Sequence, residues 1–242
     1  MRRLGLTVAA LLLCLPMVGE GQSIQYRSAG GGSFNPQDFY IVDEFLGGTT
    51  GAGSIGQLGW EGGGTVSYAT YSVFADRPGL ISYTPGATAR NGIKVPAGFA
   101  LRYANINTTI LWVAVSTGAN VPDFRAGWVS SIQTAVPADD AAFFEHEAAD
   151  TNWFAVTRDA GNETRIDTNV AFAADTFVKL KIEHPSTNVW NFYINDALVA
   201  SKSSGYIPTE TYGCHFQVQM ETYGTAVVSY VDLFWASFRS SR

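Results

Sequence analysis

Charged side chains are scarce in this sequence. Asp, Glu, Lys and Arg make up 15% of the 242 residues, whereas soluble domains carry about 25%. The formal net charge is -6, and the four lysines, Lys94, Lys179, Lys181 and Lys202, form no basic cluster. A chain with this charge repels phosphate backbones, so nucleic acid is excluded as a partner.

The sequence also lacks a hydrophobic run long enough to span a membrane. Arg2 and Arg3 precede the apolar run 4–18, which is about 15 residues long where a spanning helix needs about 20. A basic start, an apolar middle and small residues before position 22 are typical of a secretory signal peptide. The pattern predicts a signal peptide over residues 1–21 and a secreted mature protein without a membrane span. The alternative is a retained apolar arm that a partner buries.

Cysteine is nearly absent as well. Loss of residues 1–21 would remove Cys14 and leave Cys214 alone, so the mature chain could form no internal disulfide. Cys214 stands in an aromatic run of strand character, where we expect an inert buried thiol. The core must then hold the fold together, and 46% hydrophobic and 13% aromatic residues provide the material for one.

No part of the sequence shows a sustained helical period. Small and polar residues over 22–38, with three glycines in a row, predict a flexible linker, and one domain over 39–242 follows it. Short β-branched or aromatic runs recur in this domain between Gly, Pro, Asn and Asp, which is typical of strands. We expect strands at 65–73, 98–104, 109–116, 124–131, 141–147, 153–158, 163–167, 177–184, 189–194, 214–221 and 226–238.

Two segments indicate how these strands are arranged. Apolar and charged residues alternate strictly over 178–183, which places one set in a core and the other in water. Asn195 and Asp196 separate two strand runs and both tolerate positive φ, so they predict a two-residue hairpin turn, with a similar turn at 159–162. Without β–α–β alternation the sheets should be antiparallel. The predicted fold class is an all-β antiparallel β-sandwich or jelly roll.

Three stretches together resemble a known family. They are 42–45 (VDEF) with 55–60 (IGQLGW), 152–157 (NWFAVT) with 163–168 (ETRIDT), and 192–195 (FYIN) with 198–200 (LVA). In this order they resemble virion structural proteins of tailed phages, of the tail-fibre, head-fibre or decoration type, which carry a concanavalin A-like jelly-roll domain. The resemblance covers about residues 40–238. It implies a concanavalin A-like sandwich in a non-enzymatic, multimeric protein that is displayed on a surface.

Glu145 and Glu147 are the sharpest catalytic candidates. Residues two apart on a strand point to one face, about 7 Å apart at the backbone, and carboxylates at such separations hydrolyse glycosides. The pattern of concanavalin-like glucanases is Glu-x-Asp-x-Glu, however, and here Glu147 stands in the middle position and Ala149 in the last. We therefore expect no catalytic site, and we place the two glutamates on a solvated strand face or in an inter-subunit pair.

No metal or cofactor site is expected either. The three histidines show no helical pairing, and the sequence contains neither a cysteine pair nor a His-Glu-x-x-His motif. Calcium bound by loop oxygens of Asp139, Asp140 and Asp150 is the alternative, although acids of this kind more often solvate loops.

Aromatic residues suggest the surfaces that bind a partner. The five tryptophans in strand runs should pack in the core. Trp60, in the Gly-rich segment, and Tyr206 and Tyr212, on either side of Pro208, are expected at the surface. There they would form a glycan platform or a subunit contact, and the second is favoured because oligomer interfaces also concentrate Tyr and Trp.

These features predict a non-catalytic structural or surface-display subunit of a phage virion or an extracellular assembly. It would self-associate or bind other structural subunits, and many copies would turn weak sites into firm attachment. A secreted lectin-like protein that binds surface glycans is the first alternative. A glycoside hydrolase or lyase that uses Glu145 and Glu147 is the second.

Overall fold

The computed structural model describes residues 38–43, 60–62, 65–68, 81–84, 91–95, 102–116, 123–130, 140–209, 214–221 and 228–239. They form two β-sheets that pack face to face, and every pairing among the described strands is antiparallel. The predicted all-β antiparallel sandwich is therefore confirmed. The predicted signal peptide, the linker up to residue 37 and Tyr212 lie outside the described residues.

Within these stretches one sheet has eight strands. Its order is β13–β12–β11–β6–β15–β4–β3, and β1 also pairs with β15. The strands are β1 (Asp38–Asp43), β3 (Thr65–Tyr68), β4 (Ile81–Thr84), β6 (Ile106–Ser116), β11 (Val178–Ser186), β12 (Val189–Ile194), β13 (Ala197–Lys202) and β15 (Val228–Arg239).

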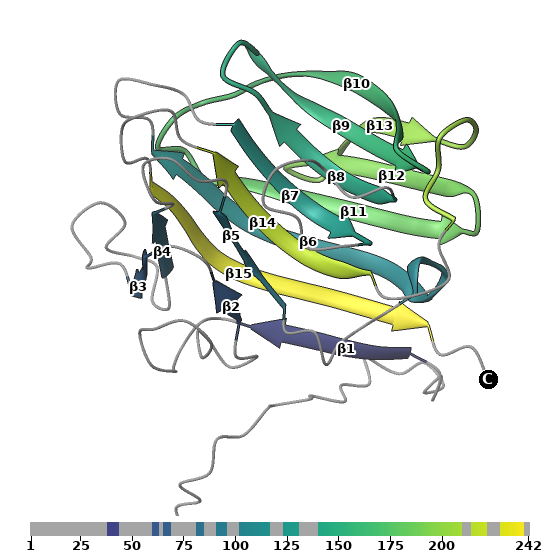
Figure 1. Ribbon diagram of the computed structural model, residues 1–242, viewed down its shortest axis with the longest axis horizontal. Helices are drawn as coiled ribbons and strands as arrows, with labels where there is room; N and C mark the ends of the chain where they lie inside the picture. The colour runs from purple at the N-terminus through teal and green to yellow at the C-terminus, as the bar shows by residue number, and fades with distance from the viewer. Residues whose placement is uncertain are drawn as a thin grey trace, which may run out of the picture.

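The second sheet has seven described strands, in the order β10–β9–β8–β7–β14–β5–β2. They are β2 (Glu61–Gly62), β5 (Asn91–Lys94), β7 (Asp123–Val129), β8 (Ala141–His146), β9 (Asn152–Asp159), β10 (Asn162–Ala171) and β14 (His215–Glu221). Figure 1 shows this sheet in front of the eight-stranded one, with the strands of both layers running in roughly the same direction. This is the aligned packing expected of two twisted sheets.

Aromatic rings fill the space between the layers. The Trp128 indole makes edge-to-face contacts with Phe216 and Phe238, at centroid distances of 5.4 and 5.8 Å. Its Nε1 donates a 2.8 Å hydrogen bond to Oγ1 of Thr109 on the facing sheet. Trp128 thus joins the two layers by packing and by a satisfied polar group, which fixes their relative position.

The predicted turns are confirmed. Asn195 and Asp196 adopt φ of 49° and 68° between β12 and β13, and Ala160 and Gly161 adopt 48° and 80° between β9 and β10. One predicted strand is partly wrong. Within 98–104 the described residues enter the 3-10 helix η2 (Tyr103–Asn105), where the Asn105 backbone N–H donates to the Arg102 carbonyl. In the described part of the chain no helix is long and apolar enough to cross a bilayer.

Candidate functional site

The outer face of the seven-stranded sheet carries polar and apolar side chains next to each other. Along β7, Phe124, Ala126 and Trp128 are buried in the core between the sheets, so the residues between them point outward. The strand register places these in two neighbouring rows: Gln219, Arg125, Glu145 and Phe154 in one, and Gln217, Gly127, Phe143 and Val156 in the other. The β7–β8 hairpin region therefore presents amide, guanidinium and carboxylate groups side by side.

A shallow hollow opens in this face at Gly127. It is lined by Arg125, Gly127, Val129, Phe143, Gln217 and Gln219. Gly127 has no side chain to fill its position in the row, and a Cβ built there would overlap the Ala142 carbonyl and the Phe143 backbone of β8. Glycine at this position is thus required by the close approach of β7 and β8, and it leaves a gap on the outer face.

The glutamines beside the hollow are almost fully covered. Gln217 is 6% exposed and Gln219 is 8% exposed. Within the described part of the chain no hydrogen bond engages the Gln217 amide, and its atoms are not among the fully buried polar atoms without a partner. The amide therefore meets solvent at the hollow, where a group that enters can hydrogen-bond to it.

Glu145 is the centre of a charge network next to the hollow. Its side chain is 3% exposed, Oε1 accepts a 2.6 Å hydrogen bond from Arg125 Nε, and Oε2 accepts one of 2.7 Å from Arg165 Nε. The Arg165 guanidinium also lies 3.5 Å above the Phe154 ring and pairs with Asp150. Both carboxylate oxygens of Glu145 are therefore engaged by cations, which leaves neither one directed at a substrate.

Glu147 is in a different environment although it lies only two residues further along the chain. Its side chain is 45% exposed, and its oxygens are 3.5 Å from Arg125 Nη2 and 3.9 Å from Arg165 Nη2. Partial burial and the neighbouring Glu145 carboxylate raise the pKa of Glu147. The two glutamates share a set of arginines, as the predicted common face requires, but only Glu147 is open to solvent.

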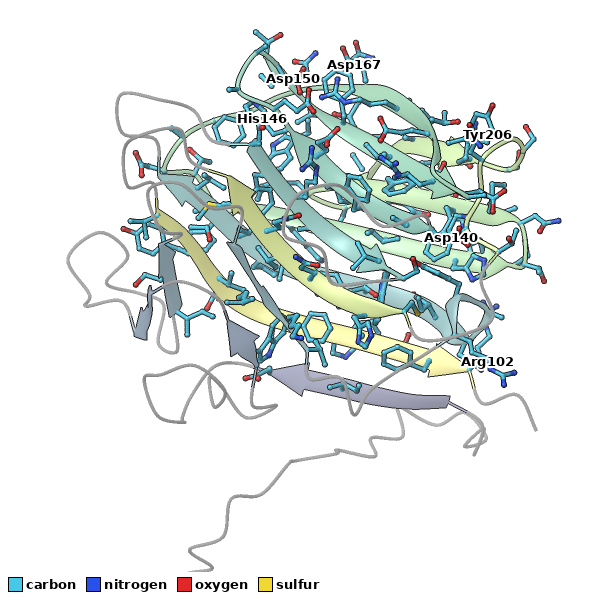
Figure 2. All side chains as sticks on the ribbon, in the orientation of Figure 1. Arg102, Asp140, His146, Asp150, Asp167 and Tyr206 are labelled. Carbon is cyan, nitrogen blue, oxygen red and sulfur yellow. The ribbon has the colours of Figure 1, made fainter. Side chains whose placement is uncertain are left out.

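The two described acids of the calcium alternative, Asp140 and Asp150, accept hydrogen bonds from groups of the same chain. Asp140 accepts hydrogen bonds of 3.0 Å from the Ala160 and Thr209 backbone N–H groups, and Asp150 accepts from the Glu147 N–H and pairs with Arg165. Figure 2 shows Asp140 and Asp150 at opposite ends of β8. Asp139 lies outside the described residues, and among those described no three acids, histidines or cysteines are placed to hold one metal ion.

The prediction that Trp60 is exposed is wrong. Its side chain is fully buried, with edge-to-face contacts to Phe216 and Phe234 at 6.3 and 5.0 Å, and its Nε1 donates a 3.0 Å hydrogen bond to Asp43 Oδ2. Trp60 directly precedes β2, and its indole packs in the core, as the indole of Trp128 does. A buried ring offers no face for a sugar.

Tyr206 is 43% exposed, as expected, in the loop that follows β13. It lies on the side of the molecule that carries Asp140 (Figure 2), and it does not line the hollow. Its role as a ligand contact, like that of Tyr212, stays a prediction. Cys214 is buried, as predicted.

Sequence reasoning missed the hollow and its amides. Gly127 is the residue that could have indicated the hollow. It lies within a predicted strand, and glycine within a strand marks a bulge or a close approach of another backbone. What could not be seen was that Gln217 and Gln219 of β14, far along the chain, stand next to that glycine.

The chain is similar in structure to several solved proteins. A protein of unknown function from Shewanella oneidensis MR-1 matches with a TM-score of 0.61 and 16% identity, over 85% of this chain and 89% of that one. The Emp47p carbohydrate recognition domain matches with a TM-score of 0.55 and 10% identity, over 87% and 100%. Bacillus licheniformis β-glucanase matches with a TM-score of 0.51 and 13% identity, over 86% and 100%. No family model and no curated protein matches the sequence. These likenesses show a concanavalin A-like jelly-roll fold, as the sequence predicts.

Proposed function

We propose that this domain is a non-catalytic glycan-binding module whose site is the hollow at Gly127. The observation that carries the proposal is the Gln217 amide, which lines the hollow, meets solvent there and is engaged by no hydrogen bond within the described residues. An amide has both donors and an acceptor, and it therefore suits the hydroxyl groups of a sugar. The Arg125 guanidinium and the Gln219 amide supply further planar polar groups beside it.

Two further observations support binding without catalysis. Glu145, the more buried acid on this face, has each oxygen engaged by an arginine, whereas a general acid or nucleophile must reach the glycosidic bond. The likeness to a carbohydrate recognition domain and to a β-glucanase makes a glycan the natural ligand class for this fold. An extracellular location, expected from residues 1–21, suits a protein that meets surface glycans.

A glycan array tests this proposal. We expect wild-type protein to bind a subset of glycans, and Gln217→Ala and Gln219→Ala to reduce that binding about tenfold or more, since one lost hydrogen bond to a buried amide is worth about 1–3 kcal/mol. Asn191→Ala, on the outer face of the other sheet, is the control that should bind normally. Absence of any glycan binding by the mature protein would refute the proposal. Release of reducing ends from a bound glycan would favour the hydrolase.

We also propose, as the second candidate, that the protein is a self-associating subunit of an extracellular assembly or a phage virion. Exposed and half-buried apolar side chains on the outer face of the eight-stranded sheet favour this. The register aligns Ile110 with Trp235, Trp112 with Leu233, and Tyr193 with Leu198, with Lys181 between Ile110 and Tyr193. Trp112 and Trp235 are half-buried, so the expectation that they pack in the core is wrong. Leu198 is 55% exposed, and the aromatic content of this face is typical of protein interfaces.

The oligomeric state tests this second function. We expect size-exclusion chromatography with light scattering to show a multimer for the wild type and a shift toward monomer for Leu198→Asp, because a charge would be buried in the contact. Leu198 is already exposed, so this exchange should leave the fold intact. Monomeric wild-type protein at high concentration would contradict self-association, while leaving glycan binding untouched.

A further inference from the structure

The size of the hollow limits what can enter it. The space above Gly127 admits roughly one water-sized group. A sugar ring therefore cannot enter and must lie across the opening, with a single small substituent directed inward. The substituent that fits determines which sugars the site selects.

The surface that lines the hollow is mostly apolar. Gly127, Val129 and Phe143 line it together with Arg125 and the two glutamines. A hydroxyl group pressed against the apolar part would lose its hydrogen bonds to water without replacement, which is unfavourable. A methyl group would bury apolar surface there, which is favourable.

The Gln217 side chain also lines the hollow. The residue is 6% exposed, and its amide, which no hydrogen bond within the described residues engages, still meets solvent. The N–H and C=O groups of the Gln217 side chain are complementary to those of a secondary amide, which offers one donor and one acceptor. A methyl group suits the apolar lining and an amide suits Gln217, so the ligand group that fits the hollow best is a methyl group attached to an amide.

The charges beside the hollow argue against anionic sugars. Glu145, Glu147 and Asp150 surround the Arg125 and Arg165 guanidinium groups, and Asp123 lies next to them, accepting a hydrogen bond from the Ala148 N–H. Four carboxylates against two guanidinium groups give this cluster a formal net charge of -2. A uronate, sialate or sulfate group would be repelled, so the substituent should be neutral.

We infer that the hollow at Gly127 is a subsite for the acetamido group of an N-acetylhexosamine unit. The acetyl methyl packs on the partly exposed Val129 side chain, and the acetamide N–H and C=O bond to the Gln217 amide. This inference rests on the proposed glycan-binding function and narrows it to neutral glycans that contain N-acetylated sugars.

Two trisaccharides with the same linkage test the acetamido subsite separately from glycan binding as such. Chitotriose carries an acetamido group on every unit, and cellotriose carries a hydroxyl group at the same position. By isothermal titration calorimetry we expect chitotriose to bind at least about tenfold more tightly, because tenfold corresponds to about 1.4 kcal/mol, well within the value of one buried hydrogen bond plus a buried methyl. In saturation-transfer NMR the acetyl methyl protons should receive the strongest transfer.

Two variants locate the preference in the hollow. Gln217→Ala should bring the affinity for chitotriose close to that for cellotriose. Val129→Thr, which replaces a methyl group in the lining with a hydroxyl group of similar size, should reduce the preference for chitotriose severalfold. Val189→Thr, the same exchange at a half-buried position on β12, is the matched control and should keep it. Circular dichroism and melting temperature confirm that each variant is folded.

The outcomes distinguish the inference from the function on which it rests. Equal affinity for the two trisaccharides, or a preference that survives both hollow variants, overturns the acetamido subsite and leaves glycan binding in place. If wild-type protein binds neither trisaccharide nor any glycan of the array, the proposed function fails and the subsite fails with it.

Discussion

Replacing each of the two neighbouring glutamates with glutamine measures what the charge network contributes. Glu145→Gln keeps the shape of the side chain but replaces one carboxylate oxygen with an NH₂ group. That group must face either Arg125 or Arg165, since each guanidinium now bonds to a different oxygen at 2.6 or 2.7 Å. Glu147→Gln makes the same exchange two residues away, where the side chain is 45% exposed.

The expected magnitudes follow from burial and distance. Hydrogen bonds to charged groups contribute about 1.5–3 kcal/mol each, and removing one partner of a buried pair costs about 3–5 kcal/mol. Because glutamine keeps one of the two acceptors, we expect Glu145→Gln to lower the free energy of unfolding by about 3 kcal/mol. At Glu147 the contacts are 3.5 and 3.9 Å and solvated, so the loss should be about 0.5 kcal/mol or less.

Equilibrium unfolding in urea, followed by tryptophan fluorescence, measures both values. For a chain of this size about 3 kcal/mol also corresponds to a melting temperature lower by roughly 6–12 °C. Equal losses for the two variants, or a loss below about 1 kcal/mol for Glu145→Gln, would show that the buried carboxylate is not held as described. Unchanged glycan affinity in the Glu147 variant would further support a site centred on the hollow.

Three other substitutions test separate parts of the structure. Gly127→Ala should lower the free energy of unfolding by about 3 kcal/mol, because the new Cβ overlaps the β8 backbone; an unchanged melting temperature would contradict the close approach. Asp140→Asn removes one acceptor from the Ala160 or Thr209 amide and should cost about 2 kcal/mol, with faster hydrogen exchange at those amides. Burial lowers the pKa of His184 from 6.5, so the folded protein binds fewer protons there and loses stability as the pH falls below about 6.5. His184→Phe should remove this part of the pH dependence in urea midpoints compared between pH 7.5 and 5, and an equal slope in both proteins would refute it.

Alternation and turn chemistry made the architecture predictable from local sequence. In β11, the residues Val178, Leu180 and Ile182 are buried and the lysines between them are half-buried, as the strict alternation requires. Asn195 and Asp196 take the positive φ that a two-residue hairpin needs. Both signals act within a few residues, so no knowledge of the partner strand is needed to use them.

Trp60 shows why a local signal can mislead. Glycines on both sides of it suggested an exposed turn, but its indole contacts Phe216 and Phe234 and donates to Asp43. All three partners are distant in sequence. The position of a side chain in a flexible-looking segment is decided by such long-range packing, which composition does not reveal.

The site was hidden for the same reason. Glu145 and Glu147 are acids close together in the sequence, yet Glu145 is held by Arg125 of the neighbouring strand β7 and by Arg165 of β10, which lies beyond β9. Both arginines come close to β8 only in the folded sheet. A carboxylate with two cationic partners is a structural group. The sequence shows the acids but not the arginines that occupy them.

The outer face of the seven-stranded sheet thus separates polar groups with a structural role from those available to a ligand. Glu145 obtains its hydrogen bonds from the protein, and its burial is therefore compensated without any ligand. Gln217 is nearly as buried, but no hydrogen bond from the described chain engages its amide, which meets solvent beside the gap that Gly127 leaves. The same steric requirement that excludes a Cβ at Gly127 also creates the space through which a ligand reaches that amide. Because the protein occupies the hydrogen-bonding groups of Glu145 and not those of Gln217, we locate binding at the hollow and not at the acids.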